Sequence, residues 1–253
     1  MNIILLGTGV AIPQLEKAQS GILVKTPEEL VLFDCGAGIL GRIVQSGYDY
    51  LKIATVFFTH HHLDHNSDFL ALLKAQQLTS DDLGIKRQSV RVYGPEGTTD
   101  WLNTLLSCYR YIDVEVDVEE LCDGDVIRVG SSVVTARKSI HSLPSLAYRM
   151  KTPTSTFVYS GDTEPSEAIK ELCHGNVDVL VHECSFPDEF SYITNHTTPA
   201  KLRDLIFDRD IERIVLTHLY PHTVGHENAM IETIKEKFKG RVDVGYDLMK
   251  IFL

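Results

Sequence analysis

The segment His60-His61-His62-Leu63-Asp64-His65 concentrates more metal-binding side chains than any other part of the chain. It follows the apolar run Ile53–Phe58, which has the length and composition of a buried strand. A strand that ends there delivers the histidines onto a loop at the edge of a sheet. Imidazole and carboxylate together suit zinc, iron or manganese. We therefore expect a sheet whose edge carries a metal site.

The spacing of these side chains indicates two ions. Residues two apart in an extended loop point the same way, so His60 and His62 can share one metal. Asp64 and His65 then turn toward a second one. The block predicts a dinuclear centre with two divalent ions. The alternative is a histidine-rich surface loop, since short motifs also occur by chance.

Three further candidate ligands stand singly in the sequence. His141, Asp162 and His218 each follow an apolar run that reads as a strand. Alone, each could be a turn-capping aspartate or a core histidine. Strand ends at one edge of a sheet converge, so with the histidine block they complete a set of five histidines and two aspartates. Asp162 has a side chain short enough to bridge both ions.

These residues resemble the metallo-β-lactamase superfamily, most strongly the branch that includes ribonuclease Z and related phosphodiesterases. The resemblance covers nearly the whole chain. Besides the histidine block, it is carried by Leu5–Gly9 with Pro13, Leu32–Gly38, Ser160–Thr163, Val181–Phe186, Asn195–Thr198 and Leu216–His218. The histidine block is specific for the superfamily, and the segments around Glu183 and His196 narrow it to the branch.

The resemblance implies how the ligands are shared. One metal would take His60, His62 and His141, the other Asp64, His65 and His218, with Asp162 between them. Asp34 would orient the metal loop from behind. Zinc is the expected metal, with manganese or iron as alternatives. Dimers are common among such proteins, so a homodimer is compatible with the resemblance.

Asp64, Glu183 and His196 are the predicted catalytic residues. A histidine paired with a carboxylate keeps one tautomer and a pKa useful near neutrality, so His196, oriented by Glu183, is the candidate proton donor to a leaving oxygen. The alternative is that His196 only caps the helix beginning at Thr198. His61 is expected to point away from the metals, whereas His174, His182, His222 and His226 receive no role.

The fold implied by the resemblance is an α+β, four-layered αβ/βα sandwich of two mixed β-sheets with outer helices. Periodicity alone does not give this arrangement. It predicts helices at 67–78, 98–109, 164–173, 198–208 and 227–238, and strands at 2–6, 21–24, 30–33, 53–58, 90–93, 114–118, 126–129, 133–136, 156–159, 177–181, 213–216 and 247–252. Trp101 and the apolar residues at 69–73 are expected to be packing faces.

Composition sets limits on size and compartment. A chain of 253 residues with 43% hydrophobic content can bury a large core, and we expect residues 1–253 to form one domain. Its five cysteines are scattered without CxxC spacing, which suits a reducing compartment. We expect no membrane association, because no apolar run approaches the roughly twenty residues of a span, and Met1-Asn2 begins no basic leader. The cytoplasm is the expected location.

The net charge of the chain limits its possible binding partners. A net charge of −11 speaks against strong nonspecific nucleic-acid binding, because phosphate contacts need Lys and Arg. Basic clusters near the predicted site loops are few, namely Lys86-Arg87 with Arg91, and Arg149 with Lys151. We interpret these as solvated surface charges.

The site and these limits favour a phosphodiesterase acting on small or cyclic phosphodiesters or on RNA ends. Ribonuclease Z carries a long arm that grips transfer RNA between the positions matching His141 and Asp162. Only residues 142–161 lie there in this chain, too few for such an arm. Transfer-RNA 3′ processing remains the main alternative, followed by hydrolysis of carboxylic esters, lactones or thioesters and by a non-enzymatic metal-bound scaffold.

Overall fold

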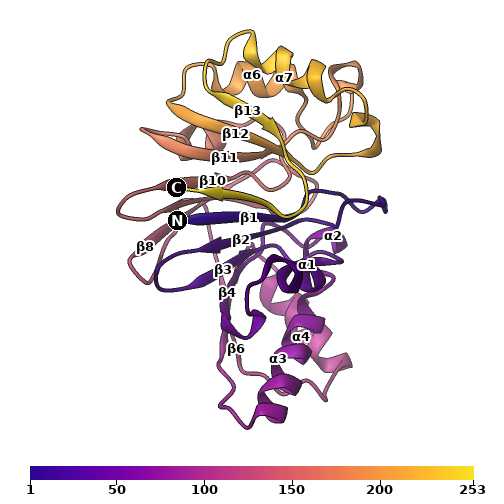
Figure 1. Ribbon diagram of the computed structural model, residues 1–253, viewed down its shortest axis with the longest axis vertical. Coiled ribbons are helices and arrows are strands. Elements are labelled where there is room, and N and C mark those ends of the chain that lie inside the picture. The colour runs from indigo at the N-terminus through magenta and orange to yellow at the C-terminus, as the bar shows by residue number, and fades with distance from the viewer.

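Two seven-stranded sheets pack face to face in the computed structural model, which describes residues 1–253, and helices cover the outer side of each (Figure 1). In sheet order, the first sheet contains β14 (Met249–Phe252), β1 (Asn2–Gly7), β2 (Gly21–Lys25), β3 (Leu30–Phe33), β4 (Ile53–Phe57), β5 (Val90–Gly94) and β6 (Val116–Glu120). The second contains β13 (Arg241–Val244), β12 (Ile211–Thr217), β11 (Val177–Glu183), β10 (Thr156–Tyr159), β9 (Leu146–Lys151), β8 (Ser132–Lys138) and β7 (Val126–Val129).

Each sheet is antiparallel in one half and parallel in the other. In the first sheet the parallel half runs from β3 to β6, and in the second it runs from β10 to β13. Parallel neighbours need a crossover connection, and most of the helices lie in these connections. Because parallel strands end at a common edge, the segments that follow them meet there.

The helices divide between the two outer faces. Buried side chains of α1 (Ile39–Ser46), α3 (Phe69–Leu83) and α4 (Thr98–Cys108) pack on the first sheet. Those of α5 (Glu167–Leu172), α6 (Pro199–Ile206) and α7 (Glu227–Lys235) pack on the second. The remaining short elements are α2 (Leu63–Asn66), η1 (Tyr50–Lys52), η2 (Asp188–Phe190) and η3 (Pro221–Thr223).

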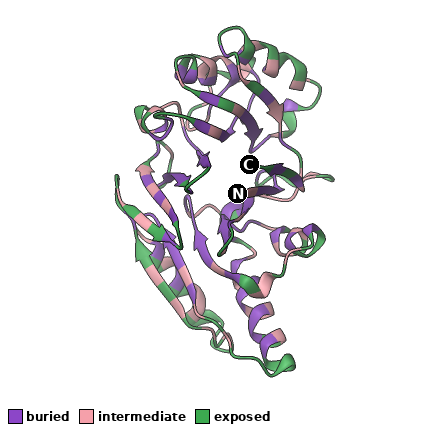
Figure 2. Cartoon of the chain, turned by 60° about the vertical axis from the view of Figure 1, so that its left-hand side comes forward, coloured by how far each residue is buried: buried purple, intermediate pink, exposed green.

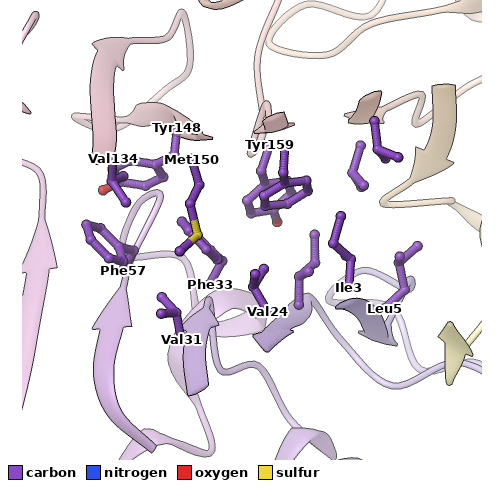
Figure 3. Close-up of a cluster of buried hydrophobic side chains, with 14 of the residues drawn as sticks. Ile3, Leu5, Val24, Val31, Phe33, Phe57, Val134, Tyr148, Met150 and Tyr159 are labelled. Carbon is purple, nitrogen blue, oxygen red and sulfur yellow. The ribbon is translucent and has the colours of Figure 1, made fainter. Parts of the chain in front are cut away.

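The central core lies between the sheets. Phe33 and Phe57 of the first sheet face Tyr148 and Tyr159 of the second (Figure 3). The Phe57 ring lies 5.2 Å from both the Phe33 and the Tyr148 ring centroids. Two further cores lie between each sheet and its outer helices, and the central strands of both sheets are largely buried (Figure 2). This packing fixes the strand ends that carry the site.

The four-layered fold is confirmed, and every predicted strand and helix is present, most of them with shifted ends. The predicted strand at 114–118 is β6 at 116–120, and the one at 247–252 begins at Met249, because Leu248 has a left-handed backbone (φ 65°). The predicted helix at 67–78 begins at Phe69 and runs on to Leu83, where Gly84 ends it with φ 62°. The helix at 164–173 is shorter because Glu164 instead pairs with Ile140 in a β-bridge.

Candidate metal centre

The seven side chains predicted as ligands lie together at the edge where the parallel strands end. They come from the segments that follow β4, β8, β10 and β12. Potential ligand atoms lie within 4.8 Å of one another in three groups, namely His60, His62, His141 and Asp162; Asp64, His65 and His218; and Asp162, His196 and His218. The first two groups contain the two predicted ligand sets, the first of them together with Asp162. The third brings in His196, which was not predicted as a ligand.

Three imidazole nitrogens converge in the first group. His62 Nδ1 lies 3.0 Å from His60 Nε2 and 3.1 Å from His141 Nε2. The other nitrogens of these two rings are engaged, because His141 Nδ1–H donates to the Asn195 carbonyl and His60 Nδ1 contacts the Thr59 hydroxyl. One proton on His62 cannot satisfy two facing lone pairs, whereas a cation can. Nitrogens of a tetrahedral zinc site lie about 3.3 Å apart.

Asp34 orients the second group by binding the His65 nitrogen that faces away from the other ligands. Its Oδ2 accepts hydrogen bonds from His65 Nδ1 at 2.8 Å, the Tyr159 hydroxyl at 2.9 Å and the Thr59 hydroxyl at 2.9 Å. The side chain is fully buried, and its backbone has φ 58°. The bond to Nδ1 fixes the tautomer of His65, so that Nε2 presents a lone pair to the site. His65 Nε2 is buried without a hydrogen-bond partner.

Asp162 lies between the two groups. Its Oδ2 is 3.8 Å from His60 Nε2 and 3.2 Å from His218 Nε2, and its Oδ1 is 3.4 Å from His65 Nε2. Gly161 precedes it with φ 55° and leaves no room for a side chain, because a Cβ there would lie 2.7 Å from Thr59 Cβ. Asp162 Oδ1 is buried and makes no hydrogen bond. The carboxylate therefore faces both candidate metal positions.

His218 completes the second group. Ser185 Oγ donates to Glu183 Oε2 and lies 3.0 Å from His218 Nδ1, which therefore donates to it. His218 Nε2 is left to face Asp64 Oδ2 at 3.3 Å. The left-handed backbone of His218, with φ 54°, turns the ring inward directly after β12.

The electrostatics of the cluster fit a cation. Burial opposes a charge on His65, yet the carboxylates of Asp162 and Asp34 outweigh it and raise the pKa of His65 well above its ordinary value. Burial likewise opposes ionisation of Asp162, but His218 and His65 hold the pKa of this carboxyl well below its usual range. Ionised carboxylates, converging lone pairs and unpartnered buried atoms together suit bound divalent ions.

Glu183 and His196 form a pair beside the cluster. His196 Nδ1–H donates to Glu183 Oε1 at 2.9 Å, and the buried Glu183 carboxylate also accepts from the backbone N–H groups of Thr163 and Ser185. Burial lowers the pKa of His196, but the hydrogen bond and charge of Glu183 raise it above its ordinary value. His196 does not cap α6, since Thr198 is the N-cap residue and Asp188 accepts from the Ala200 N–H.

His61 points away from the ligands, as predicted. Its ring stacks on Trp101 with centroids 4.6 Å apart, and Nε2 donates to the Thr98 hydroxyl, which itself donates to the Pro95 carbonyl. Trp101 also packs on Phe58, which confirms its packing role.

Sequence reasoning missed the supporting groups Tyr159, Ser185 and the Asn195 carbonyl, because no spacing marks a single hydroxyl or carbonyl as a partner of a ligand.

Two features border the cluster where a substrate can approach. A cavity of about 520 Å³ has His141 in its wall beside Ile140, Leu143 and Lys138. On another side, the Phe186 ring stacks on Tyr220 at 4.4 Å and lies 5.8 Å from His196. The site is therefore open beside the metal ligands and flanked by apolar and aromatic surface.

Comparison with known proteins identifies the family. The model of the beta-lactamase superfamily domain matches residues 30–219, which include all seven predicted ligands. The chain belongs to the metallo-β-lactamase superfamily. This confirms the superfamily predicted from the histidine block.

The proteins to which the chain is similar support the predicted branch, the one that includes ribonuclease Z. The chain is 27% identical to ribonuclease Z of Methanosarcina mazei over 99% of this chain and 97% of the relative. Among solved structures, the metallo-β-lactamase fold protein YhfI of Bacillus subtilis superposes with a TM-score of 0.88 at 22% identity, covering 99% of this chain and 98% of that one. The short form of human tRNase Z superposes with a TM-score of 0.81 at 22% identity, covering 100% and 99%.

Proposed function

We propose that this protein is a dinuclear metal-dependent phosphodiesterase that acts on small or cyclic phosphodiesters or on RNA ends. The observation that carries the proposal is the His196–Glu183 pair, held 2.9 Å apart beside a cluster of five histidines and two aspartates. A metal pair alone also serves hydrolysis at carbonyl carbon. A positioned imidazole adds proton transfer to a poor leaving group, which phosphodiester cleavage requires. We take residues 1–253 as one catalytic domain working in the cytoplasm.

In this proposal the two predicted ligand sets hold the ions. One set is His60, His62 and His141, the other is Asp64, His65 and His218, and Asp162 is shared. Zinc suits this mixture of imidazole and carboxylate, and manganese and iron take the same donors. When bound, two such ions lower the pKa of a shared water toward neutrality and offset charge on the attacked group.

His196 supplies the proton to the departing oxygen. Its Nδ1–H is held by Glu183, so the proton on Nε2 is the one available to a substrate. The negative charge of Glu183 stabilises the imidazolium form, which keeps that proton in place until the leaving oxygen needs it. Glu183 remains a positioning residue, because it is fully buried and its oxygens already accept bonds from the surrounding backbone.

The surroundings favour a small substrate. The cavity beside His141, of about 520 Å³, is in the range of small-molecule sites. The net charge of −11 disfavours long polyanions. Only residues 142–161 separate His141 from Asp162, and they include β9 and β10, so no long arm projects from this region.

Transfer-RNA 3′ processing is the second candidate, favoured by the ribonuclease Z relatives. The alignment with the Methanosarcina mazei enzyme spans 304 positions, whereas this chain has 253 residues. At least 51 positions of that alignment therefore have no counterpart here. The relative is therefore the longer protein, and this chain has only residues 142–161 between His141 and Asp162, too few for an added arm. We therefore rank small phosphodiesters and RNA ends first.

The test uses the metal-loaded protein and compares two phosphodiester substrates that have different leaving groups. Nitrophenolate leaves bis(p-nitrophenyl) phosphate without a proton, whereas the ribose oxygen leaving 2′,3′-cyclic AMP needs one. His196→Ala should slow turnover of the cyclic nucleotide by roughly 10²- to 10⁴-fold and affect the nitrophenyl ester far less. Glu183→Gln should produce the same selectivity with a smaller loss.

A panel of lactones, thioesters and precursor transfer RNA completes the experiment. Preferential turnover of a lactone or thioester, or equal losses on both phosphodiesters in His196→Ala with unchanged metal content, would contradict the proposal. Efficient processing of precursor transfer RNA at physiological salt would promote the second candidate.

A further inference from the structure

A second cavity, lined almost wholly by polar groups, lies at the other end of the second sheet. It has a volume of about 300 Å³ and lies between β9, the β9–β10 turn and the loop joining α5 to β11. Its wall consists of Arg149, Lys151, Thr152, Pro153, Thr154, Ser155, Thr156, His174, Gly175, Asn176 and Asp178. On β10, Thr156 lies six residues before Asp162, and Val158, the partner of Arg149, lies four residues before it. At about 3.3 Å per residue, the cavity is therefore about 13 to 20 Å along the sheet from the metal cluster.

Arg149 is the central feature of this cavity. It is 7% exposed and is the only buried residue among the lysines and arginines of the chain. The expectation that Arg149 and Lys151 form a solvated surface pair is therefore wrong for Arg149. The reason is that α5 packs over this part of β9 and covers the guanidinium.

The guanidinium has no counter-charge within the protein. Its Nη1 donates to the carbonyls of Leu172 and His174 at the end of α5, while Nε and Nη2 make no hydrogen bond. Eight other arginines form ion pairs with carboxylates, namely Arg42, Arg87, Arg91, Arg137, Arg203, Arg209, Arg213 and Arg241. The unbonded N–H groups are not among the fully buried unpartnered atoms, so they reach the solvent of the cavity. An anion placed there would supply the counter-charge that the largely buried guanidinium lacks.

The neighbouring side chains add positive potential. Lys151 forms no ion pair, and His174 Nδ1–H donates to the Glu171 carbonyl, which leaves Nε2 free. Arg149, then burial and then Lys151 lower the pKa of His174, as expected where cations gather. Asp178 is the only acid in the wall, and its Oδ2 is occupied by the Thr156 N–H at 2.6 Å.

We propose that this cavity binds the phosphate group of a small molecule or free inorganic phosphate, at a site separate from the metal centre. The free Nε and Nη2 of Arg149 offer the fork that matches two phosphate oxygens. Lys151 supplies a second charge, and the hydroxyls of the β9–β10 turn supply neutral donors. A volume of about 300 Å³ is at the lower limit of small-molecule sites and is large enough for a phosphate group.

Residue-resolved NMR of the metal-loaded protein tests this site without interference from phosphate at the metals. Inorganic phosphate and glycerol 3-phosphate are titrated separately while the backbone amides of Thr154, Ser155 and Gly175 are followed. The chemical shifts of these amides should change and reach saturation as the ligand concentration rises. The ligand that saturates the shifts at the lower concentration identifies the source of the phosphate group. Lys151→Ala should weaken binding by about tenfold, the effect of losing one charge-assisted hydrogen bond.

The matched control is Lys239→Ala, which removes an exposed lysine that does not line the cavity and should leave the affinity unchanged. Arg149→Lys should weaken binding at least as much as Lys151→Ala, with its melting temperature measured to show that the variant is folded. The proposal is overturned if neither ligand produces saturable shifts at these amides. It is also overturned if the Lys151 and Lys239 variants bind equally well.

Discussion

At the scale of single residues, three of the candidate histidine ligands are oriented by a partner on the ring nitrogen that faces away from the other ligands. Asp34 holds His65, Ser185 holds His218 and the Asn195 carbonyl holds His141. Such partners fix the tautomer and raise the basicity of the metal-facing nitrogen. The ligands could be predicted from residue type and spacing, whereas most of their partners could not, because serines and backbone carbonyls occur throughout the chain.

Asp34→Asn tests this support directly. The amide keeps the size of the side chain, and asparagine tolerates the left-handed backbone at this position. It places a neutral group, and in one orientation a competing donor, against His65 Nδ1–H. Zinc affinity measured by chelator competition should fall by about 10- to 100-fold. The exposed Asp82→Asn is the control, and an unchanged affinity in Asp34→Asn would show that the bond to His65 does not tune the site.

At the scale of elements, strands were predictable wherever an apolar run is bounded by polar residues. β9 was missed because Arg149 interrupts its apolar pattern, and β13 because two of its four residues are charged. α1 was missed because it has only eight residues between Gly38 and Gly47, both with positive φ. Asp247 was assigned to a strand but accepts hydrogen bonds from the Thr8 and Ala18 backbone N–H groups, a loop contact that no local pattern encodes.

The contact between the metal loop and α4 makes stability depend on pH. Burial lowers the pKa of His61 to about 4, so this ring is neutral in the folded protein. In the unfolded chain a histidine titrates near 6.5. Protonation therefore favours the unfolded state, and stability is lost as pH falls below the unfolded value toward 4. Between pH 7.5 and 6 the loss from His61 is up to about 0.8 kcal/mol.

Urea unfolding of the metal-loaded protein at both pH values measures this effect. His61→Gln should show a smaller difference in the free energy of unfolding between the two pH values than the wild-type protein. The exposed His222→Gln should behave like wild type. The same pH dependence in all three proteins would mean that His61 is accessible to protons in the fold.

At the scale of the whole molecule, the site exists because two sheets meet. Ligands follow β4 of the first sheet and β8, β10 and β12 of the second, so none of the layers holds a complete set. Sequence patterns predicted twelve of the fourteen strands, all except β9 and β13, and the resemblance to a known family implied the layers. Pairing between distant strands, such as β14 with β1, could not be read from periodicity, because it depends on contacts across the whole chain.

The central claim is that this edge binds two metal ions, and metal content measures it most directly. Elemental analysis after mild purification and zinc loading should give a ratio approaching two ions per chain, because two complete ligand sets share Asp162. Asp162→Ala should retain its fold and lose at least one ion, together with phosphodiester hydrolysis. A wild-type protein that hydrolyses phosphodiesters while binding no transition metal under any loading condition would contradict the account.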